Sequence, residues 1–349
     1  MNTYSYIYIH NLYFNLIKMS YSTSPIIAGK FFFVKNNFKN DFDSKDVDII
    51  EFKPIEKSDK PIFDKFFKAR YYENAHLNFT NLYMWREPYN IQWSLHNDVI
   101  YMISQWHSKA AALQPLGAED KMQEAIANII EWFKTNEKDN KVTIGGIERS
   151  FVEELKKFPD AKFEIKANPE NFDYVYLAYD LINLAGRKYH SKKNHLNSFQ
   201  KNYPMANYLP ITEKIIPKCR EELNRWYELR SPELPNDPFL DLESVAINEV
   251  LDNFCDFKIK GGAIELDGRI IAFTFGEQLN TDTAVIHVEK ADPDIRGAYP
   301  AINQGFVANE WSTMKFINRE EDMGLEGLRK AKESYKPIKM IEKFTATLK

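Results

Sequence analysis

Hydrophobic residues along this chain alternate between two spacings, and the order of those spacings predicts the fold. A period of two predicts a strand, and a period of three to four predicts an amphipathic helix. Residues 59–70 show the helical pattern, with their phenylalanines on one side. Residues 91–95 and 99–103 flank Asn97-Asp98, two residue types that tolerate the positive φ of tight turns. We therefore expect a β-hairpin here.

Strands and helices continue to alternate after this hairpin, and the same plan is then repeated. In the first half, strands are expected at 49–55, 111–116, 141–144, 163–167 and 173–180, and helices at 119–134 and 149–158. In the second half, strands are expected at 208–211, 259–266, 269–278, 283–289, 314–317 and 338–347, and helices at 218–229, 242–253, 300–311 and 325–334. This mixed order predicts α/β layers with two central mixed sheets, each flanked by helices.

The pattern also suggests where the chain divides. We expect an N-terminal domain at 48–183, a basic helical connector at 184–206 and a C-terminal domain at 207–349. Residues 1–47 are dense in Asn, Tyr, Phe, Ser and Lys and have no consistent period, which predicts a poorly ordered extension. An aromatic anchor at a membrane surface is the alternative for this extension.

Composition narrows the class of protein. The 349 residues are 44% hydrophobic and 28% charged, with a net charge of −4, which argues against a surface built entirely for nucleic acid. The chain has two cysteines and no run of about 18 apolar residues that could span a bilayer. These properties predict a cytoplasmic protein without a transmembrane segment or a metal site. Its oligomeric state stays open.

A basic loop lies where a strand is followed by a helix. Arg296-Gly297 and Tyr299 stand between the strand 283–289 and the helix expected from residue 300. Unpaired N–H groups at a helix N-terminus favour phosphate. The order of the surrounding elements, and loosely the loop itself, resembles the donor-binding region of acyl-CoA N-acyltransferases of the GNAT fold. The resemblance places an activated acyl donor at this loop. The further donor-binding candidates are His287 and Glu289 on the strand, and Lys330, Lys332 and Lys336 along the donor path.

Three residues of the following segment are candidates for catalysis. Asn318 ends a predicted strand and Tyr335 follows the next helix, and both resemble acyltransferase positions. A tyrosine phenol can protonate a leaving group that lies within hydrogen-bonding distance. Glu320, in the acidic run 320–322, is a candidate general base for an acceptor amine. Packing of Tyr335 on the core, and an acidic turn that faces solvent, are the structural alternatives.

Three longer motifs resemble one bacterial family. They are Asn-Phe-Thr-Asn-Leu-Tyr-Met-Trp-Arg at 78–86, Gly-Arg-Lys-Tyr-His-Ser-Lys-Lys-Asn-His-Leu-Asn-Ser-Phe at 186–199, and Asn-Arg-Glu-Glu-Asp-Met-Gly-Leu-Glu-Gly-Leu-Arg-Lys-Ala-Lys at 318–332. The chain is similar over residues 48–349 to proteins related to the C-terminal domain of phosphatidylglycerol lysyltransferase and to Fem-type aminoacyltransferases. The resemblance implies two tandem GNAT-like domains. It also implies transfer of an aminoacyl group from a charged tRNA to a lipid or peptide amine or hydroxyl.

The connector is positively charged in an otherwise mildly acidic chain. Its candidate contacts with tRNA are Arg187, Lys188, Lys192, Lys193 and His195. Clustered cations of this kind attract phosphate backbones with a salt-dependent affinity. A solvated helix between domains is the structural alternative.

Two classes of function remain open from the sequence. One is a transferase in which the acceptor attacks the donor directly, without a permanently bound cofactor. Its donor is aminoacyl-tRNA or acyl-CoA, and its acceptor is a small molecule, a peptide or a lipid head group. The other is a non-catalytic binding module that keeps the fold. We expect His76 to be structural or on the surface, and Trp85 to pack in the core or on a hairpin rather than to stack on bases.

Overall fold

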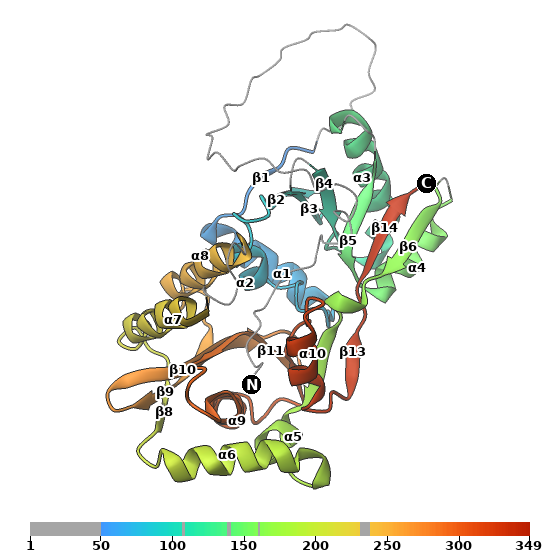
Figure 1. The fold of residues 1–349 in the computed structure, drawn as a ribbon. Helices are drawn as coiled ribbons and strands as arrows, with labels where there is room; N and C mark the ends of the chain where they lie inside the picture. Colours follow the sequence, from blue (N-terminus) through green and yellow to red (C-terminus); the bar gives the residue numbers. More distant parts are fainter. Residues whose placement is uncertain (1–49, 107–108, 138–140, 160, 231–237) are drawn as a thin grey trace, which may run out of the picture.

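The computed structural model describes residues 50–106, 109–137, 141–159, 161–230 and 238–349, and the predicted extension lies outside them. Within this part of the chain the strands form two seven-stranded mixed sheets. Figure 1 shows the sheets one above the other, with helices around both. The predicted architecture of two mixed sheets flanked by helices is confirmed.

The first sheet is built mainly from the N-terminal half. Its order is β1 (Lys53–Pro54), β2 (Gln92–His96), β3 (Val99–Trp106), β4 (Lys109–Leu113), β5 (Thr143–Ile147), β14 (Phe344–Leu348) and β6 (Phe163–Ala167). Helices α3 (Met122–Asn136) and α4 (Arg149–Lys157) share one hydrophobic cluster with β3, β5 and β14. The predicted hairpin is confirmed, since Asn97 and Asp98 both have positive φ, 49° and 59°.

The second sheet is built mainly from the C-terminal half. Its order is β13 (Lys339–Ile341), β7 (Asp173–Leu177), β12 (Phe316–Asn318), β11 (Thr283–Ala291), β10 (Arg269–Gln278), β9 (Lys260–Leu266) and β8 (Asn207–Pro210). The helices of this half are α6 (His190–Asn202), α7 (Ile216–Arg230), α8 (Pro238–Asp252), α9 (Ala298–Glu310) and α10 (Glu326–Glu333). Helix α9 packs on β9, β10 and β11, and α6 packs on α9. The hairpin predicted around Asp267-Gly268 is confirmed by positive φ at both residues.

Two strands cross between the halves, which the sequence did not predict. The segment expected to close the first half pairs instead in the second sheet, where β7 lies between β12 and β13. The single final strand expected at 338–347 is two strands, and the second of them, β14, enters the first sheet beside β5 and β6 (Figure 1). Periodicity shows that a segment is extended but not which strand it pairs with. The domain boundaries at 183 and 207 remain predictions. Each of these two strands pairs in the sheet that belongs mainly to the other side of those boundaries.

The two halves also share a hydrophobic core. The largest cluster joins α1 (Lys60–Ala69) and α2 (Phe79–Met84) of the first half to α7, α8 and β10 of the second. Two short helices were not predicted, α2 and α5 (Ala178–Asn183). All six residues of α2 are buried, so the segment lacks the alternation between polar and apolar faces that identifies a surface helix.

Candidate active site

The two central strands of the second sheet separate after three paired residues. β11 and β12 run parallel and pair from Thr283 with Phe316 to Val285 with Asn318. β11 then continues to Ala291 without β12 beside it, while the chain after Asn318 turns away. The separation leaves a gap beside β11, into which the neighbouring elements place their side chains.

A β-bulge lies on β11 next to this gap. Phe275 pairs with Val288 and Gly276 pairs with Ile286, so His287 is the extra residue on β11. A bulge leaves its extra residue outside the regular ladder and redirects the local backbone. Gly276 is required opposite the bulge, because a Cβ at this position would lie 2.1 Å from the carbonyl oxygen of Val285. The close approach therefore fixes the register on both sides of His287.

His287 is completely buried between two carboxyl groups. Its Nε2 lies 3.0 Å from Glu277 Oε1, and its Nδ1 lies 2.9 Å from Glu320 Oε1. Burial favours the neutral ring, but the two carboxyl groups outweigh it and raise the pKa of His287 to about 9. Burial also raises the pKa of Glu320, against the opposing effect of His287. The imidazole is therefore expected to be protonated at neutral pH.

The acidic run after β12 faces the interior. Asn318, Arg319, Glu320, Glu321 and Asp322 are all buried, and Glu320 and Asn318 are 0% exposed. The interpretation of 320–322 as a solvent-facing turn is therefore wrong. A sequence of charges normally indicates a solvated loop, but here each charged side chain has an oppositely charged partner from another element.

Asn318 connects β12 with the first half. Its Nδ2 donates to the carbonyl oxygen of Glu73 and to Asp173 Oδ2, both at 3.1 Å. Its Oδ1 accepts the backbone N–H of Glu320 at 2.8 Å, and Glu320 has a positive φ of 56°. Asn318 thus stabilises the turn that directs Glu320 toward His287.

A second buried network joins the first, and the sequence did not predict it. Lys343 Nζ lies 2.6 Å from Asp173 Oδ1, 3.0 Å from Glu321 Oε2 and 3.0 Å from His76 Nε2. Burial favours the neutral lysine, but Asp173 and Glu321 outweigh it and raise the pKa of Lys343. Asp173 begins β7 and Lys343 lies between β13 and β14, so this ion pair holds the chain where it crosses between the sheets.

Glu289 and Tyr335 both contact Arg319, the residue that follows β12. Glu289 accepts hydrogen bonds from Arg319 Nη2 at 3.0 Å and from Asn303 Nδ2 at 2.8 Å. Tyr335 is 5% exposed, and its ring is contacted by the Arg319 guanidinium and by Lys192 Nζ at 4.8 and 4.2 Å from its centroid. The side chain of Tyr335 is thus both part of the core and in contact with two cations.

Two lysines near Tyr335 have lowered pKa values. Burial, with repulsion from Arg319, lowers the pKa of Lys332 to about 7 and that of Lys192 to about 8. Lys332 is 1% exposed, and its Nζ donates to the carbonyl oxygen of Arg319. Both amines are therefore partly neutral near physiological pH and can exchange protons.

The predicted donor loop contacts the basic connector. Helix α9 begins at Ala298 after Gly297, whose φ of 93° favours glycine. A Cβ on Gly297 would lie 2.7 Å from the carbonyl oxygen of His195 on α6. Burial, together with Arg296 and Lys192, lowers the pKa of His195. Two features that the sequence showed separately therefore meet on one face of the second half.

Several of the other predicted residues lie on the surface or serve the fold. Tyr299 accepts a hydrogen bond from Trp226 Nε1 at 3.1 Å. The exposed candidates are Arg187, Lys188, Lys193, Arg296, Lys330 and Lys336. Within this group Lys188 pairs with Asp180 and Lys330 pairs with Glu326. Hydrogen bonds thus join His287, Glu320 and Asn318 in one group. Glu289, Lys332 and Tyr335 contact Arg319 in a second group, in which Lys192 contacts Tyr335.

Comparison with known proteins identifies the family. The family model described as "Phosphatidylglycerol lysyltransferase, C-terminal" matches residues 69–347. This chain belongs to that family. Membership confirms the resemblance found in the sequence motifs, and the description of the family implies aminoacyl or acyl transfer as its class of reaction.

Solved structures agree with the family assignment. A conserved protein of unknown function from Bacteroides thetaiotaomicron is 33% identical, with a TM-score of 0.80 over 86% of this chain and 100% of that one. The structure of L-PGS from Bacillus licheniformis is 13% identical, with a TM-score of 0.58 over 83% of this chain and 92% of that one. The second similarity extends to the fold alone, which is the predicted tandem acyltransferase arrangement.

One curated relative matches part of the chain. The protein MYCGA3080 of Mycoplasmoides gallisepticum, which is described as uncharacterized, is 23% identical over 185 residues. This match covers 53% of the present chain and 59% of that protein. Among the helices that the structure describes, none has the length and apolar character needed to cross a membrane.

Proposed function

We propose that this protein transfers an aminoacyl group from a charged tRNA to an amine or hydroxyl of a small molecule, a peptide or a lipid head group. The main support is the separation of β11 from β12 next to the His287 bulge, together with Tyr335, which contacts Lys192 and shares a hydrophobic cluster with Ile286 of β11. An activated acyl group bound there would lie between backbone donors and titratable side chains. Acyl-CoA is the alternative donor.

The reaction in this proposal is a direct displacement. The acceptor nitrogen or oxygen forms a bond to the acyl carbonyl carbon, and the ester bond to the tRNA ribose breaks. Backbone N–H groups of β11 beside the bulge would stabilise the oxyanion. Glu320, whose pKa is raised by burial, would receive the acceptor proton. The Tyr335 hydroxyl would donate a proton to the departing ribose oxygen.

The connector supplies the affinity for the donor in this proposal. The exposed Lys193 and Arg296 flank the partly buried Lys192 and His195 on the face where α6 meets the start of α9. Cations that neutralise phosphates release counterions, so binding weakens as salt rises. This face could follow the acceptor end of a tRNA toward the gap.

The activity is tested by offering the purified protein both donors. Radiolabelled aminoacyl-tRNA pools and radiolabelled acetyl-CoA are incubated with a mixture of amines and lipid head groups, and transferred label is counted. We expect transfer from aminoacyl-tRNA, and a reduction of about 100-fold in Tyr335→Phe. Tyr208→Phe is the matched control, because the buried Tyr208 hydroxyl has no hydrogen-bond partner among the described residues. Absence of transfer from both donors would contradict the proposal.

The choice of donor is tested by salt dependence. Lys193→Glu should weaken tRNA binding and reduce the slope of log affinity against log salt by about one. Lys166→Glu is the control, since Lys166 is an exposed lysine on β6 of the first sheet. A CoA donor predicts little effect at Lys193 and a strong effect of Arg296→Ala on acetyl transfer.

A non-catalytic binding module remains the second candidate, and one observation favours it. The first turn of α9 presents few donors for phosphate, because Ala298 N–H donates to the carbonyl oxygen of Ile295 and Pro300 has no N–H. Combining Tyr335→Phe with Arg296→Ala separates the candidates. Unchanged function in cells would support the binding module, and loss of function would support the transferase.

A further inference from the structure

Each sheet ends in two edge strands, and three of the four edges within the described residues are short or contain proline. β1 has two residues and ends with Pro54, β13 has three residues, and β8 has four and ends with Pro210. Short edge strands and prolines disfavour pairing with another chain. The fourth edge strand, β6, has five residues and no proline. It is therefore the edge best suited to pairing.

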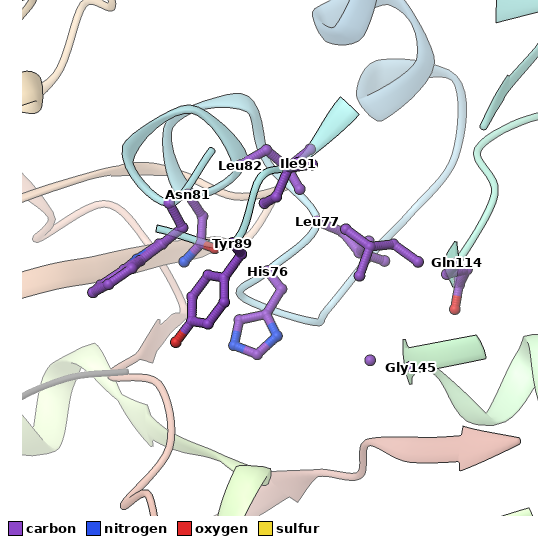
Figure 2. Close-up of a pocket in the computed structure, with 11 residues that line it drawn as sticks. His76, Leu77, Asn81, Leu82, Tyr89, Ile91, Gln114 and Gly145 are labelled. Carbon is purple, nitrogen blue, oxygen red and sulfur yellow. The ribbon is translucent and has the colours of Figure 1, made fainter. Parts of the chain in front are cut away.

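The middle of the first sheet faces the interior of the protein. The ends of β4 and β5 adjoin a small, mainly apolar cavity beside α2, where Figure 2 shows Leu77, Leu82 and Ile91. Helices α3 and α4 pack on β3, β5 and β14. Among the described strands β6 pairs with β14 alone, and Figure 1 shows it beside β14 at the side of the molecule. A partner that extends this sheet at this side therefore meets β6.

The register of β6 with β14 determines which backbone groups face outward. Asn168 N–H donates to the Lys343 carbonyl oxygen, and Lys349 N–H donates to the Lys162 carbonyl oxygen. The pairing between these points is regular. Bonding alternates along an antiparallel strand, so even-numbered residues of β6 face β14 and odd-numbered residues face away. The backbone groups that point out of the sheet edge are those of Phe163, Ile165 and Ala167.

The side chains of β6 form an apolar face and a charged face. Phe163 and Ile165 pack against the hydrophobic cluster that includes α3 and α4. Glu164 and Lys166 alternate with them and are 50% and 69% exposed, with Oε1 and Nζ 3.2 Å apart. The two charges have opposite signs and flank the central residue, Ile165. A strand with this pattern is complementary to a second copy of itself.

We propose that β6 pairs with β6 of a second copy of this chain, antiparallel and about a two-fold axis at Ile165. In this register Glu164 lies opposite Lys166 of the second copy, and Lys166 lies opposite its Glu164. On the apolar face, Ile165 meets its own copy and Phe163 meets Ala167. Each outward-facing pair exchanges two backbone hydrogen bonds. The two seven-stranded sheets then form one continuous sheet.

The charges select this register over its neighbours. A shift by two residues places Glu164 opposite Glu164, or Lys166 opposite Lys166, of the second copy. Like charges directly opposite each other destabilise a strand pair, and opposite charges stabilise it. A shift by one residue places the apolar face of one strand beside the charged face of the other. The sequence of β6 therefore fits a second copy in a single register.

The proposed contact is small. A standard interface includes about 20–30 residues a side, whereas this pairing involves the five residues of β6. We expect a weak dimer with a Kd of about 10–100 μM. Well below this range the chain is monomeric, so variants at Lys166 still serve as controls for tRNA binding and unfolding. The dimer does not depend on the transferase activity proposed above.

Sedimentation equilibrium of the full chain, at concentrations that span this range, tests the pairing. We expect the wild type to pass from monomer to dimer. Glu164→Lys makes both charges of the strand positive and Lys166→Glu makes both negative, so each variant should dimerise about tenfold more weakly. Lys134→Glu is the matched control, since Lys134 is an exposed lysine on α3 that also lies beside a glutamate. It should dimerise like the wild type.

A mixture of the two variants gives the decisive comparison. The positive strand of Glu164→Lys then faces the negative strand of Lys166→Glu, so the equimolar mixture should dimerise at least as tightly as the wild type. Misfolding of either variant cannot produce this recovery. The double variant Glu164→Lys, Lys166→Glu should also dimerise like the wild type. A monomeric wild type, normal dimerisation of Glu164→Lys alone, or no recovery in the mixture overturns the proposal.

Amide hydrogen exchange shows where the two copies meet. The outward-facing N–H of Ile165 should exchange more slowly as the wild-type concentration rises through the Kd. The N–H of Glu164, which faces β14, should be unaffected. In Glu164→Lys the exchange at Ile165 should no longer depend on concentration. Equal exchange at Ile165 in the wild-type monomer and dimer would place the interface elsewhere and overturn the proposal.

Discussion

The substitution Lys343→Met tests the buried network that joins the two sheets. Lys343 is 1% exposed and faces two carboxylates, Asp173 at 2.6 Å and Glu321 at 3.0 Å. Methionine has nearly the same length and is apolar, so the substitution removes the charge and leaves little cavity. Both carboxylates then stay buried without their cation, and the local charge becomes more negative by one.

The expected effect is large. Removing one partner of a buried ion pair destabilises a protein by about 3–5 kcal/mol. We expect about 4 kcal/mol here, since one lysine neutralises two carboxylates. This is a substantial part of the stability of a typical domain, about 5–15 kcal/mol. The melting temperature should fall by about 10 °C.

The effect should also depend on pH. Burial would raise the pKa of Glu321, but Lys343 and His76 outweigh it and hold this pKa well below 4.5. The wild type therefore gains stability from Glu321 above the unfolded pKa and loses it as the pH falls through the folded pKa. Without Lys343, burial raises the pKa instead and the sign reverses. The deficit of the variant should thus be larger at pH 8 than at pH 5.

Urea unfolding at both pH values measures these quantities. Lys166→Met is the control, because the exposed pair between Lys166 and Glu164 contributes at most about 1 kcal/mol. Adding Glu321→Gln to Lys343→Met should recover about 1–2 kcal/mol by removing one uncompensated charge. The reasoning is refuted if Lys343→Met costs less than about 1 kcal/mol, or if the double variant is no more stable than the single one.

Three further substitutions test other parts of the site. Burial lowers the pKa of Lys332 to about 7, so the free energy of unfolding of the wild type should rise as the pH rises from 7 toward 10. Lys332→Met lacks this amine, so its stability relative to the wild type in urea unfolding should fall by on the order of 2 kcal/mol between pH 7 and 9.5. A difference that does not change with pH would contradict this prediction. Gly276→Ala should cost on the order of 3 kcal/mol in thermal melting, because its Cβ would lie 2.1 Å from the Val285 carbonyl oxygen; a neutral result would mean that the bulge moves freely. The pKa of His287 is raised to about 9, so protonated His287 stabilises the fold fully below pH 6.5 and loses this contribution as the pH rises through 9. Glu277→Gln should lower the pKa of His287 measured by NMR titration. An unchanged pKa would exclude the pair with Glu277 as a cause of the raised value.

Much of the candidate site could be anticipated because its residues lie at the ends of elements that the sequence predicts well. The resemblance to the acyltransferase pattern indicates Asn318 and Tyr335, and the acidic run 320–322 indicates Glu320. The structure places Asn318 and Glu320 in the buried network and Tyr335 beside Lys192. Their catalytic roles remain predictions.

The network residues that the sequence did not predict come from distant parts of the chain. Asp173, Lys343 and His76 meet although His76 and Lys343 are 267 residues apart, and no pattern of spacing marks such a meeting. The expectation that His76 is structural or on the surface agrees with its buried position in this network, but its partners Glu321 and Lys343 could not be predicted.

The sequence by itself determined the local elements and their order. A hydrophobic period of two identifies strands, and a period of three to four identifies helices. Asn97-Asp98 and Asp267-Gly268 identify hairpins. All of these signals depend on neighbouring residues alone. Tertiary structure decided which strands pair and which charges are buried. β7 and β14 cross between the sheets, and the acidic run after β12 faces cations from other elements, because pairing and desolvation depend on segments that meet only in the folded chain.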